Sequence, residues 1–172
     1  MSQPKIDFVI TWVDGTDPKW LAEKLRTLQE ADSFEAQKTD SSDLRFRNDF
    51  DFLRFWFRGV EKFAPWVNQI FFVTYGHTPN WLNLDHPKLK IIRHEDFIPH
   101  EFLPTFNSHT IENHLHLIPG LSEYFVYFND DFYLLKATKL TDFFIKASSK
   151  KFAKSQKHSK TSAETYLPCA FF

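Results

Sequence analysis

The chain has 172 residues, of which 42% are hydrophobic, 18% aromatic and 25% charged. This composition supplies enough apolar area for the core of one domain and excludes an intrinsically disordered protein. The single cysteine, Cys169, excludes an internal disulfide. No run approaches the roughly 20 apolar residues of a membrane-spanning helix. We therefore expect a globular domain that folds in water.

Predicted strands and helices alternate along the chain. Runs of β-branched and aromatic residues predict strands at residues 6–13, 69–75, 89–93 and 124–128, with a short extended piece at 132–135. Apolar residues at helical spacing predict helices at 18–31, 50–63, 108–117 and 141–147. This alternation is typical of an α/β fold with a mostly parallel sheet and flanking helices. Ligands of such sheets bind beyond the carboxyl ends of the strands.

The first predicted strand runs into an Asp-Gly turn, TWVDGTD at residues 11–17. An α/β nucleotide-binding domain often receives the base and ribose of its ligand at this point. Asp14, Gly15 and Asp17 are therefore candidate binding residues, and Trp12 can either stack on a ligand or fill the core. The other interpretation is an ordinary turn, in which Asp17 caps the helix that starts at Pro18.

Two arginines, Arg45 and Arg47, flank Phe46 just before the second predicted helix. On an extended segment their side chains point the same way and can hold a diphosphate through paired hydrogen bonds. The alternative is a pair of surface arginines that balance the acidic residues around them.

The segment FNSHTIENH at residues 106–114 predicts a helix with polar groups on one face. His109 and Glu112 are three residues apart and share that face with Asn113. His109 can serve as a general base or as a hydrogen-bond donor to phosphate. The same residues also allow a transition-metal site or a plain surface helix that Asn107 or Ser108 caps.

Adjacent carboxylates follow the last aromatic strand, in the sequence Asn129-Asp130-Asp131. Two neighbouring carboxylates at the end of a strand need compensation when they are withdrawn from water. A hard divalent cation provides it through oxygen ligands. Asp130 and Asp131 are therefore candidate ligands of Mg²⁺ or Mn²⁺, and the alternative is a turn whose carboxylates are solvated.

Charge is unevenly distributed, although the net charge is −1. Residues 1–135 carry 13 Lys or Arg and 20 Asp or Glu, whereas residues 136–160 carry eight Lys and one Asp. The basic segment is either a solvated tail or a weak contact for an anionic membrane surface or a polyanionic glycan. Nucleic acid is not expected as a partner, because the rest of the chain is acidic.

Two long blocks of the sequence resemble the Stealth family. The first is IDFVITWVDGTDPKW at residues 6–20. The second runs from RFRNDFDFLRFWFRGVEKFAPW at residue 45 to EYFVYFNDDFYLL at residue 135. The family includes bacterial capsular polysaccharide phosphotransferases and the eukaryotic N-acetylglucosamine-1-phosphotransferase.

The resemblance implies a Rossmann-like domain that binds a nucleotide-sugar. The implied reaction moves a sugar 1-phosphate from a UDP-sugar donor to a hydroxyl of a glycan acceptor and releases UMP, with Mg²⁺ or Mn²⁺, during capsule or exopolysaccharide synthesis. The implied catalytic residues are His109, Arg45, Arg47 and Glu112. The implied nucleotide-sugar-binding residues are Trp12, Asp14, Gly15, Asp17 and Asn107, and the implied metal ligands are Asp130 and Asp131.

The sequence departs from the family pattern after the second block. We expect an incomplete catalytic domain at residues 1–147 and a divergent Lys-rich tail at residues 148–172, because the family's third and fourth blocks are not recognisable. Two alternatives stay open: a non-catalytic fragment that binds nucleotide-sugar or glycan, and a metal-dependent glycosyltransferase that releases UDP. The amino terminus lacks a signal-peptide pattern, so the expected location is the cytoplasm. Contact of the basic segment with the inner face of the bacterial membrane stays open beside a solvated tail.

Overall fold

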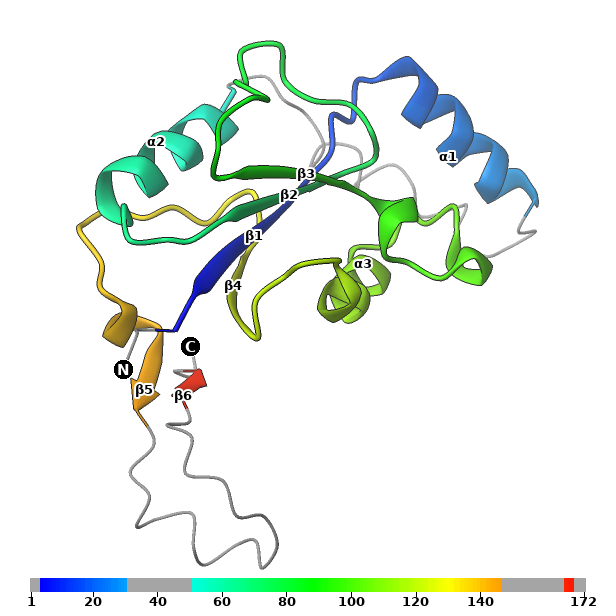
Figure 1. Ribbon diagram of the computed structural model, residues 1–172. Helices are drawn as coiled ribbons and strands as arrows, with labels where there is room; N and C mark the ends of the chain where they lie inside the picture. The colour runs from blue at the N-terminus through cyan, green and yellow to red at the C-terminus, as the bar shows by residue number, and fades with distance from the viewer. Residues whose placement is uncertain (1–3, 31–50, 147–165, 169–172) are drawn as a thin grey trace, which may run out of the picture.

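The computed structural model describes residues 4–30, 51–146 and 166–168. Its main sheet has four strands in the order β3-β2-β1-β4, and each neighbouring pair is parallel (Figure 1). The strands are β1 (Ile6–Trp12), β2 (Ile70–Thr74), β3 (Leu89–Arg93) and β4 (Tyr124–Phe128). The helices are α1 (Pro18–Glu30), α2 (Leu53–Phe63) and α3 (Ser108–His114). This is the Rossmann-like α/β fold that the sequence predicts.

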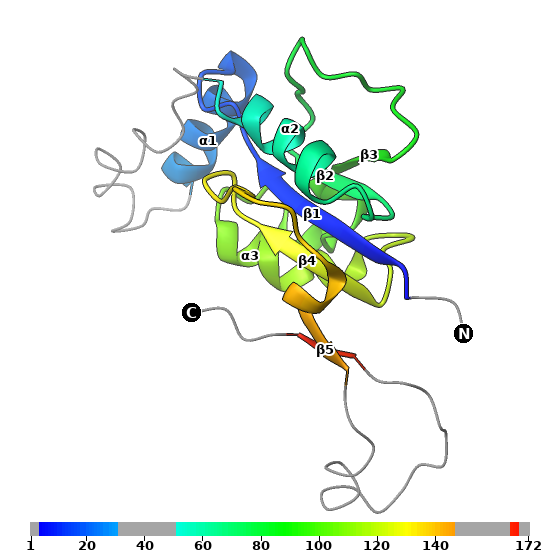
Figure 2. The ribbon, with the colours of Figure 1, turned by 90° about the vertical axis from the view of Figure 1, so that its left-hand side faces the viewer.

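The sheet is covered on both faces. Side chains of β1 alternate between two apolar clusters because successive residues of a strand point to opposite faces. Phe8 and Ile10 belong to the cluster that contains Trp56 of α2, whereas Val9 belongs to the cluster that contains Leu115 after α3. Figure 2 shows α2 on one side of β1 and α3 on the other. Burial on both faces explains why residues 8–10 of β1 and 70–73 of β2 are continuous apolar runs.

Helix boundaries follow from local signals. The predicted helix at 18–31 is confirmed as α1, which begins at Pro18. The helix predicted at 50–63 begins at Leu53 instead, because Asp51 has a φ of 51°, outside the helical region. The helix predicted at 108–117 ends as α3 at His114, and a 3₁₀ turn continues it. None of the helices in the described ranges is long and apolar enough to cross a bilayer.

The segment after β4 differs from the prediction. Residues 132–135, predicted as a short extended piece, belong to no strand of the sheet, and the helix predicted at 141–147 is wrong over the described residues 141–146. A 3₁₀ turn at Leu140–Asp142 leads instead into the strand β5 (Phe144–Lys146), which pairs in antiparallel fashion with β6 (Tyr166–Pro168). Aromatic and β-branched residues favour a strand here, and Phe144 is buried in the core cluster that also holds Phe8.

One buried carboxylate ties the amino-terminal ends of the strands together. Asp7 in β1 is fully buried, and its side chain accepts three hydrogen bonds. The donors are Asn68 Nδ2 at 2.7 Å, the backbone N–H of Gln69 at 3.1 Å and the backbone N–H of Ser122 at 2.8 Å. These donors precede β2 and β4, so Asp7 joins three chain segments at this edge.

Candidate active site

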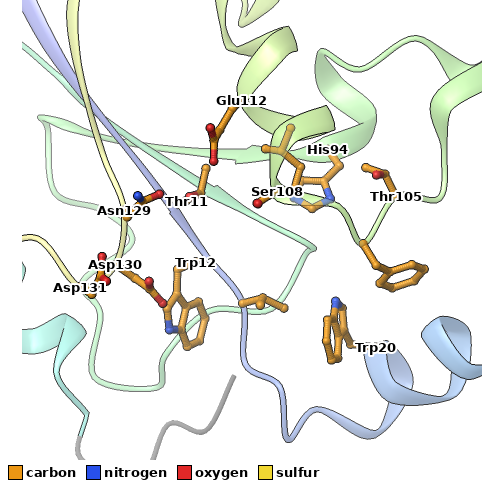
Figure 3. Close-up of a pocket in the computed structure, with 13 residues that line it drawn as sticks. Thr11, Trp12, Trp20, His94, Thr105, Ser108, Glu112, Asn129, Asp130 and Asp131 are labelled. Atoms are coloured by element: carbon orange, nitrogen blue, oxygen red, sulfur yellow. The ribbon is translucent and has the colours of Figure 1, made fainter. Parts of the chain in front are cut away.

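A pocket of about 470 Å³ lies at the carboxyl edge of the sheet (Figure 3). Ile10 of β1 pairs with Phe128 of β4, so residues that follow these two strands lie side by side. The loop before α3 and the first two turns of α3 complete the walls. The lining residues are Thr11, Trp12, Val13, Trp20, His94, Thr105, Phe106, Ser108, Ile111, Glu112, Asn129, Asp130 and Asp131. The parallel topology thus creates the concavity where the fold predicts one.

The turn after β4 brings Asn129, Asp130 and Asp131 to one end of this pocket. All three residues are exposed, and Tyr133 donates a hydrogen bond from its hydroxyl to the backbone oxygen of Asp130 at 2.9 Å. Burial raises the pKa of Tyr133, and the charges of Asp130 and Asp131 raise it further. The two carboxylates therefore place negative charge at the mouth of the pocket.

The hydroxyl of Tyr127, in β4, contacts three polar residues that line the pocket. Its hydroxyl donates to Asn129 Oδ1 at 2.7 Å, lies 3.0 Å from the hydroxyl of Thr11 and 3.4 Å from Glu112 Oε1. Burial raises the pKa of Tyr127 to about 12, and the Glu112 carboxylate adds to this rise. The phenol therefore stays protonated at neutral pH and can hold the Asn129 amide in one orientation. Sequence reasoning missed this residue, because it reads as one more aromatic side chain in a buried strand.

Helix α3 presents Ser108, Ile111 and Glu112 to the pocket. These positions have the i, i+3, i+4 spacing of one helix face. Asn107 caps the helix, since its Oδ1 accepts the backbone N–H of His109 at 2.9 Å. His109 is exposed and is not among the pocket-lining residues. Of the predicted residues on this helix, the structure therefore places Glu112 in the pocket and His109 outside it.

The Asp-Gly turn after β1 is closed by its own side chains. Asp14 Oδ1 accepts hydrogen bonds from the backbone N–H of Thr16 at 2.9 Å and from its hydroxyl at 2.6 Å. Asp17 Oδ1 accepts the backbone N–H of Trp20 at 2.8 Å and so caps α1. Asp14, Gly15 and Asp17 do not line the pocket, although Trp12 does. The ring of Trp12 stacks on Phe72, with the centroids 5.7 Å apart.

His77, in the loop after β2, supports this turn. The backbone N–H of Asp14 donates to His77 Nε2 at 2.7 Å, so this nitrogen must be unprotonated. Burial lowers the pKa of His77, while the charges of Asp17 and Asp14 oppose that shift. A neutral imidazole therefore fixes the position at which the chain leaves β1 for the pocket.

The other end of the pocket is aromatic. Trp20 meets Phe106 edge to face with a centroid separation of 5.7 Å, and Phe106 lies 5.7 Å from Tyr75 at an interplanar angle of 30°. Tyr75 in turn contacts the ring of His94 at 5.8 Å and donates a hydrogen bond to Glu23. Burial, followed by this hydrogen bond, raises the pKa of Tyr75. These rings form an aromatic wall beside Thr105 and Ser108.

Comparison with known proteins gives a family. Residues 4–30 match the model of Stealth protein conserved region 1, and residues 45–152 match conserved region 2. The chain belongs to the Stealth protein family. The two conserved regions contain every residue that lines the pocket.

Several curated Stealth relatives are polysaccharide phosphotransferases by name. The chain is 50% identical over 139 residues to the capsular polysaccharide phosphotransferase WcwK of Streptococcus pneumoniae, over 81% of this chain and 41% of the relative. It is 46% identical over 145 residues to the capsular polysaccharide phosphotransferase eps5J of Streptococcus thermophilus, over 84% of this chain and 60% of the relative. It is 45% identical over 139 residues to the exopolysaccharide phosphotransferase cps2G of Lactiplantibacillus plantarum. The chain thus spans between 39% and 60% of these relatives.

Arg45 and Arg47, the predicted phosphate clamp of this Stealth chain, lie outside the residues that the structure describes. No lysine or arginine of residues 4–30, 51–146 and 166–168 lines the pocket. The described walls of the pocket therefore offer no cationic side chain to an anionic ligand.

A histidine that the sequence did not single out lies deep in the Stealth pocket. His94 is 9% exposed, and its Nδ1 atom has no hydrogen-bond partner among the described residues. Burial lowers the pKa of His94 to about 4, with a smaller contribution from His77. The sequence offers no spacing that separates His94 from the exposed histidines around it, because its burial depends on how the loop after β3 packs.

Proposed function

We propose that this chain forms the donor-binding part of a sugar-1-phosphate transferase in capsular or exopolysaccharide synthesis. The donor is a UDP-sugar, the acceptor is a hydroxyl group of a glycan, and the products are a phosphodiester and UMP. The observation that carries this proposal is the pocket itself, which has adjacent carboxylates at one end, an aromatic wall at the other and Glu112 between them (Figure 3). The names of the Stealth relatives support the phosphotransferase class.

The oxygen ligands at the end of β4 fit Mg²⁺ or Mn²⁺. These hard cations take oxygen ligands, and Mg²⁺ commonly uses one or two carboxylates together with substrate phosphates and water. Asp130 and Asp131 supply two exposed carboxylates. The described residues contain no group of three or more His, Cys, Asp or Glu side chains placed to hold a metal alone. This pattern fits an ion that binds together with the diphosphate, where it would neutralise charge on the departing phosphate.

Glu112 is the proposed general base for the acceptor. The acceptor hydroxyl loses its proton to the Glu112 carboxylate as its oxygen attacks the β-phosphorus of the donor. The bond between that phosphorus and the bridging oxygen breaks, and the bridging oxygen leaves with UMP. Asn129, held by Tyr127, orients the phosphate end of the donor. Arg45, Arg47 and His109 remain proposed contributors from the neighbouring segments.

Donor binding without turnover is a second candidate for the chain by itself. The absence of a basic side chain from the described pocket walls favours it, because transferases of this kind stabilise the transition state with cationic groups. The two candidates share one binding site and differ in whether UMP accumulates.

The experiment combines calorimetry with product analysis. Binding of UDP-glucose in the presence of Mg²⁺ should weaken at least about tenfold in the Asp130→Asn, Asp131→Asn double variant, since the cation loses its charged ligands. The matched control is Asp85→Asn, an exposed carboxylate in the loop between β2 and β3. Chromatography of the nucleotide after incubation with acceptor glycan separates UMP from UDP. Unchanged affinity in the double variant would contradict the metal role, and UDP as the product would contradict phosphoryl transfer.

A further inference from the structure

The aromatic end of the pocket contains a buried polar atom without a partner. His94 is 9% exposed, lines the pocket, and its Nδ1 makes no hydrogen bond within the described residues. Buried polar atoms in folded proteins are nearly always paired, so an unpaired atom on a residue that lines a pocket points to a ligand there. Figure 3 shows His94, Thr105 and Trp20 grouped on the opposite side of the pocket from Asn129, Asp130 and Asp131.

The surroundings of His94 define what kind of group fits there. Trp20 and Phe106 line this end of the pocket, and the ring of Tyr75 lies against Phe106 and His94. No charged side chain lines this end. An aromatic wall with isolated polar atoms suits a flat, uncharged heteroaromatic ring that has hydrogen-bonding groups on its edge.

The protonation state of His94 selects against an anionic partner. The imidazole is neutral at physiological pH, because burial holds its pKa near 4. A neutral imidazole has one donor and one acceptor nitrogen. It therefore matches the amide-like edge of a nucleobase better than a phosphate group, which prefers a cationic donor.

We infer that His94 is the base-recognition residue of this site, and that it hydrogen-bonds the edge of the donor's nucleobase while the aromatic rings hold the face. This inference rests on the proposed function, and it fixes the direction of the donor. The base lies toward Trp20 and Phe106, and the diphosphate lies toward Asp130 and Asp131. His94 is thus a binding and specificity residue and takes no part in proton transfer.

Affinity measurements on the 172-residue chain test this assignment with three probes: UMP, ribose 5-phosphate and inorganic pyrophosphate, each with Mg²⁺. The His94→Phe variant keeps the ring volume and removes both nitrogens. It should bind UMP about tenfold more weakly, as expected for one lost hydrogen bond to a desolvated group. With CMP added as a specificity control beside the three probes, its preference for UMP over CMP should fall toward one. Affinity for ribose 5-phosphate and pyrophosphate should not change.

Two further variants control the measurement. His94→Asn keeps a polar group near the position of Nδ1 and should recover most of the UMP affinity. His116→Asn changes an exposed histidine outside the pocket and should behave as the unaltered chain. Thermal melting should show His94→Phe to be at least as stable as the unaltered chain, because the substitution removes an unpaired buried polar atom.

A measurement on the unaltered chain does not depend on any variant folding. In ¹⁵N-histidine spectra, UMP should shift the ring nitrogens of His94, whereas ribose 5-phosphate should not. Equal UMP affinity of His94→Phe, or no shift of the His94 resonances at saturating UMP, would overturn the inference. If pyrophosphate binds and UMP gains nothing over ribose 5-phosphate, base recognition fails while the proposed function stands. If none of the three probes binds, both fail.

Discussion

Carboxylates at the two ends of the parallel sheet lie in opposite environments, one buried and the other exposed. At the amino-terminal edge, Asp7 is fully buried and accepts hydrogen bonds from three N–H groups. At the carboxyl edge, Asp130 and Asp131 are exposed at the mouth of a pocket. A buried carboxylate that is surrounded by donors holds the fold together, whereas exposed carboxylates beside a concavity can exchange water for a cation. Residue type alone therefore does not distinguish a structural acid from a functional one.

Removal of Asp7 should give the largest effect on stability. Asp7→Ala leaves the N–H groups of Asn68, Gln69 and Ser122 without their acceptor in a buried place, which should cost about 4 kcal/mol of unfolding free energy. Urea denaturation measures this difference. Asp130→Asn should change the same quantity by less than about 0.5 kcal/mol, as is usual for exposed positions. Equal losses of unfolding free energy in the two variants would contradict the difference between the two edges.

The loss of folding stability at acidic pH should depend on the burial of His94. The folded-state pKa of about 4 lies below the ordinary pKa of about 6.5 in the unfolded chain. Between these values the unfolded chain binds the proton and the folded chain does not, so stability falls as the pH drops from about 6.5 toward 4. His94 should contribute about 2 kcal/mol to the loss between about pH 7 and pH 5, and His94→Phe should lose that much less stability over the same range. Parallel stability curves for the two proteins would show that His94 titrates normally.

The Tyr127→Phe variant should show how much the orientation of Asn129 contributes to donor binding while the charge of the site stays the same. The variant removes the hydroxyl that donates to Asn129 but leaves both aspartates in place. We expect UDP-glucose affinity to fall about fivefold, which corresponds to about 1 kcal/mol for one hydrogen bond. Calorimetry at fixed Mg²⁺ concentration measures this change. The Tyr133→Phe variant, which loses a hydrogen bond to the backbone of Asp130, is the matched comparison. Unchanged affinity in Tyr127→Phe would show that the fixed orientation of Asn129 does not contribute to donor binding.

The smallest effect on donor affinity is expected at the turn after β1. Asp17→Ala removes the cap of α1 and should cost about 1 kcal/mol of unfolding free energy. Because Asp17 does not line the pocket, affinity for UDP-glucose should change by less than about twofold. Urea denaturation and calorimetry on the same preparation give both numbers. A loss of affinity without a loss of stability would show that Asp17 is a binding residue, as the sequence predicts.

The strands and the first helix could be predicted because their signals are local. The β-branched and aromatic run of β1, and the Asp17-Pro18 cap and first turn of α1, each lie within a few residues. The segment at 141–147 could not be predicted in the same way. Its strand β5 exists through pairing with β6, about 20 residues later in the chain, and the local sequence does not show that partner.

The site was only partly predictable for the same reason. The position of Asp130 and Asp131 at the carboxyl edge follows from a strand that ends in polar residues within a parallel sheet. The choice of Glu112 over His109 as the residue that faces the pocket depends on where Asn107 caps α3. The burial of His94 depends on tertiary packing alone. Patterns in a sequence locate an edge of the sheet, but they do not say which side chains turn inward there.

Paramagnetic broadening tests most directly that the acids of the carboxyl edge, and not those of the opposite edge, hold a cation on the donor. Substoichiometric Mn²⁺ is added to the ¹⁵N-labelled chain with UDP-glucose, and amide signals are followed. We expect the signals of Asn129, Asp130 and Asp131 to broaden first, those of Thr11 and Trp12 with them, and those of Asn68 and Ser122 beside Asp7 to stay sharp. Broadening centred on Asn68 and Ser122, or no broadening that depends on UDP-glucose, would contradict a cation site at the end of β4.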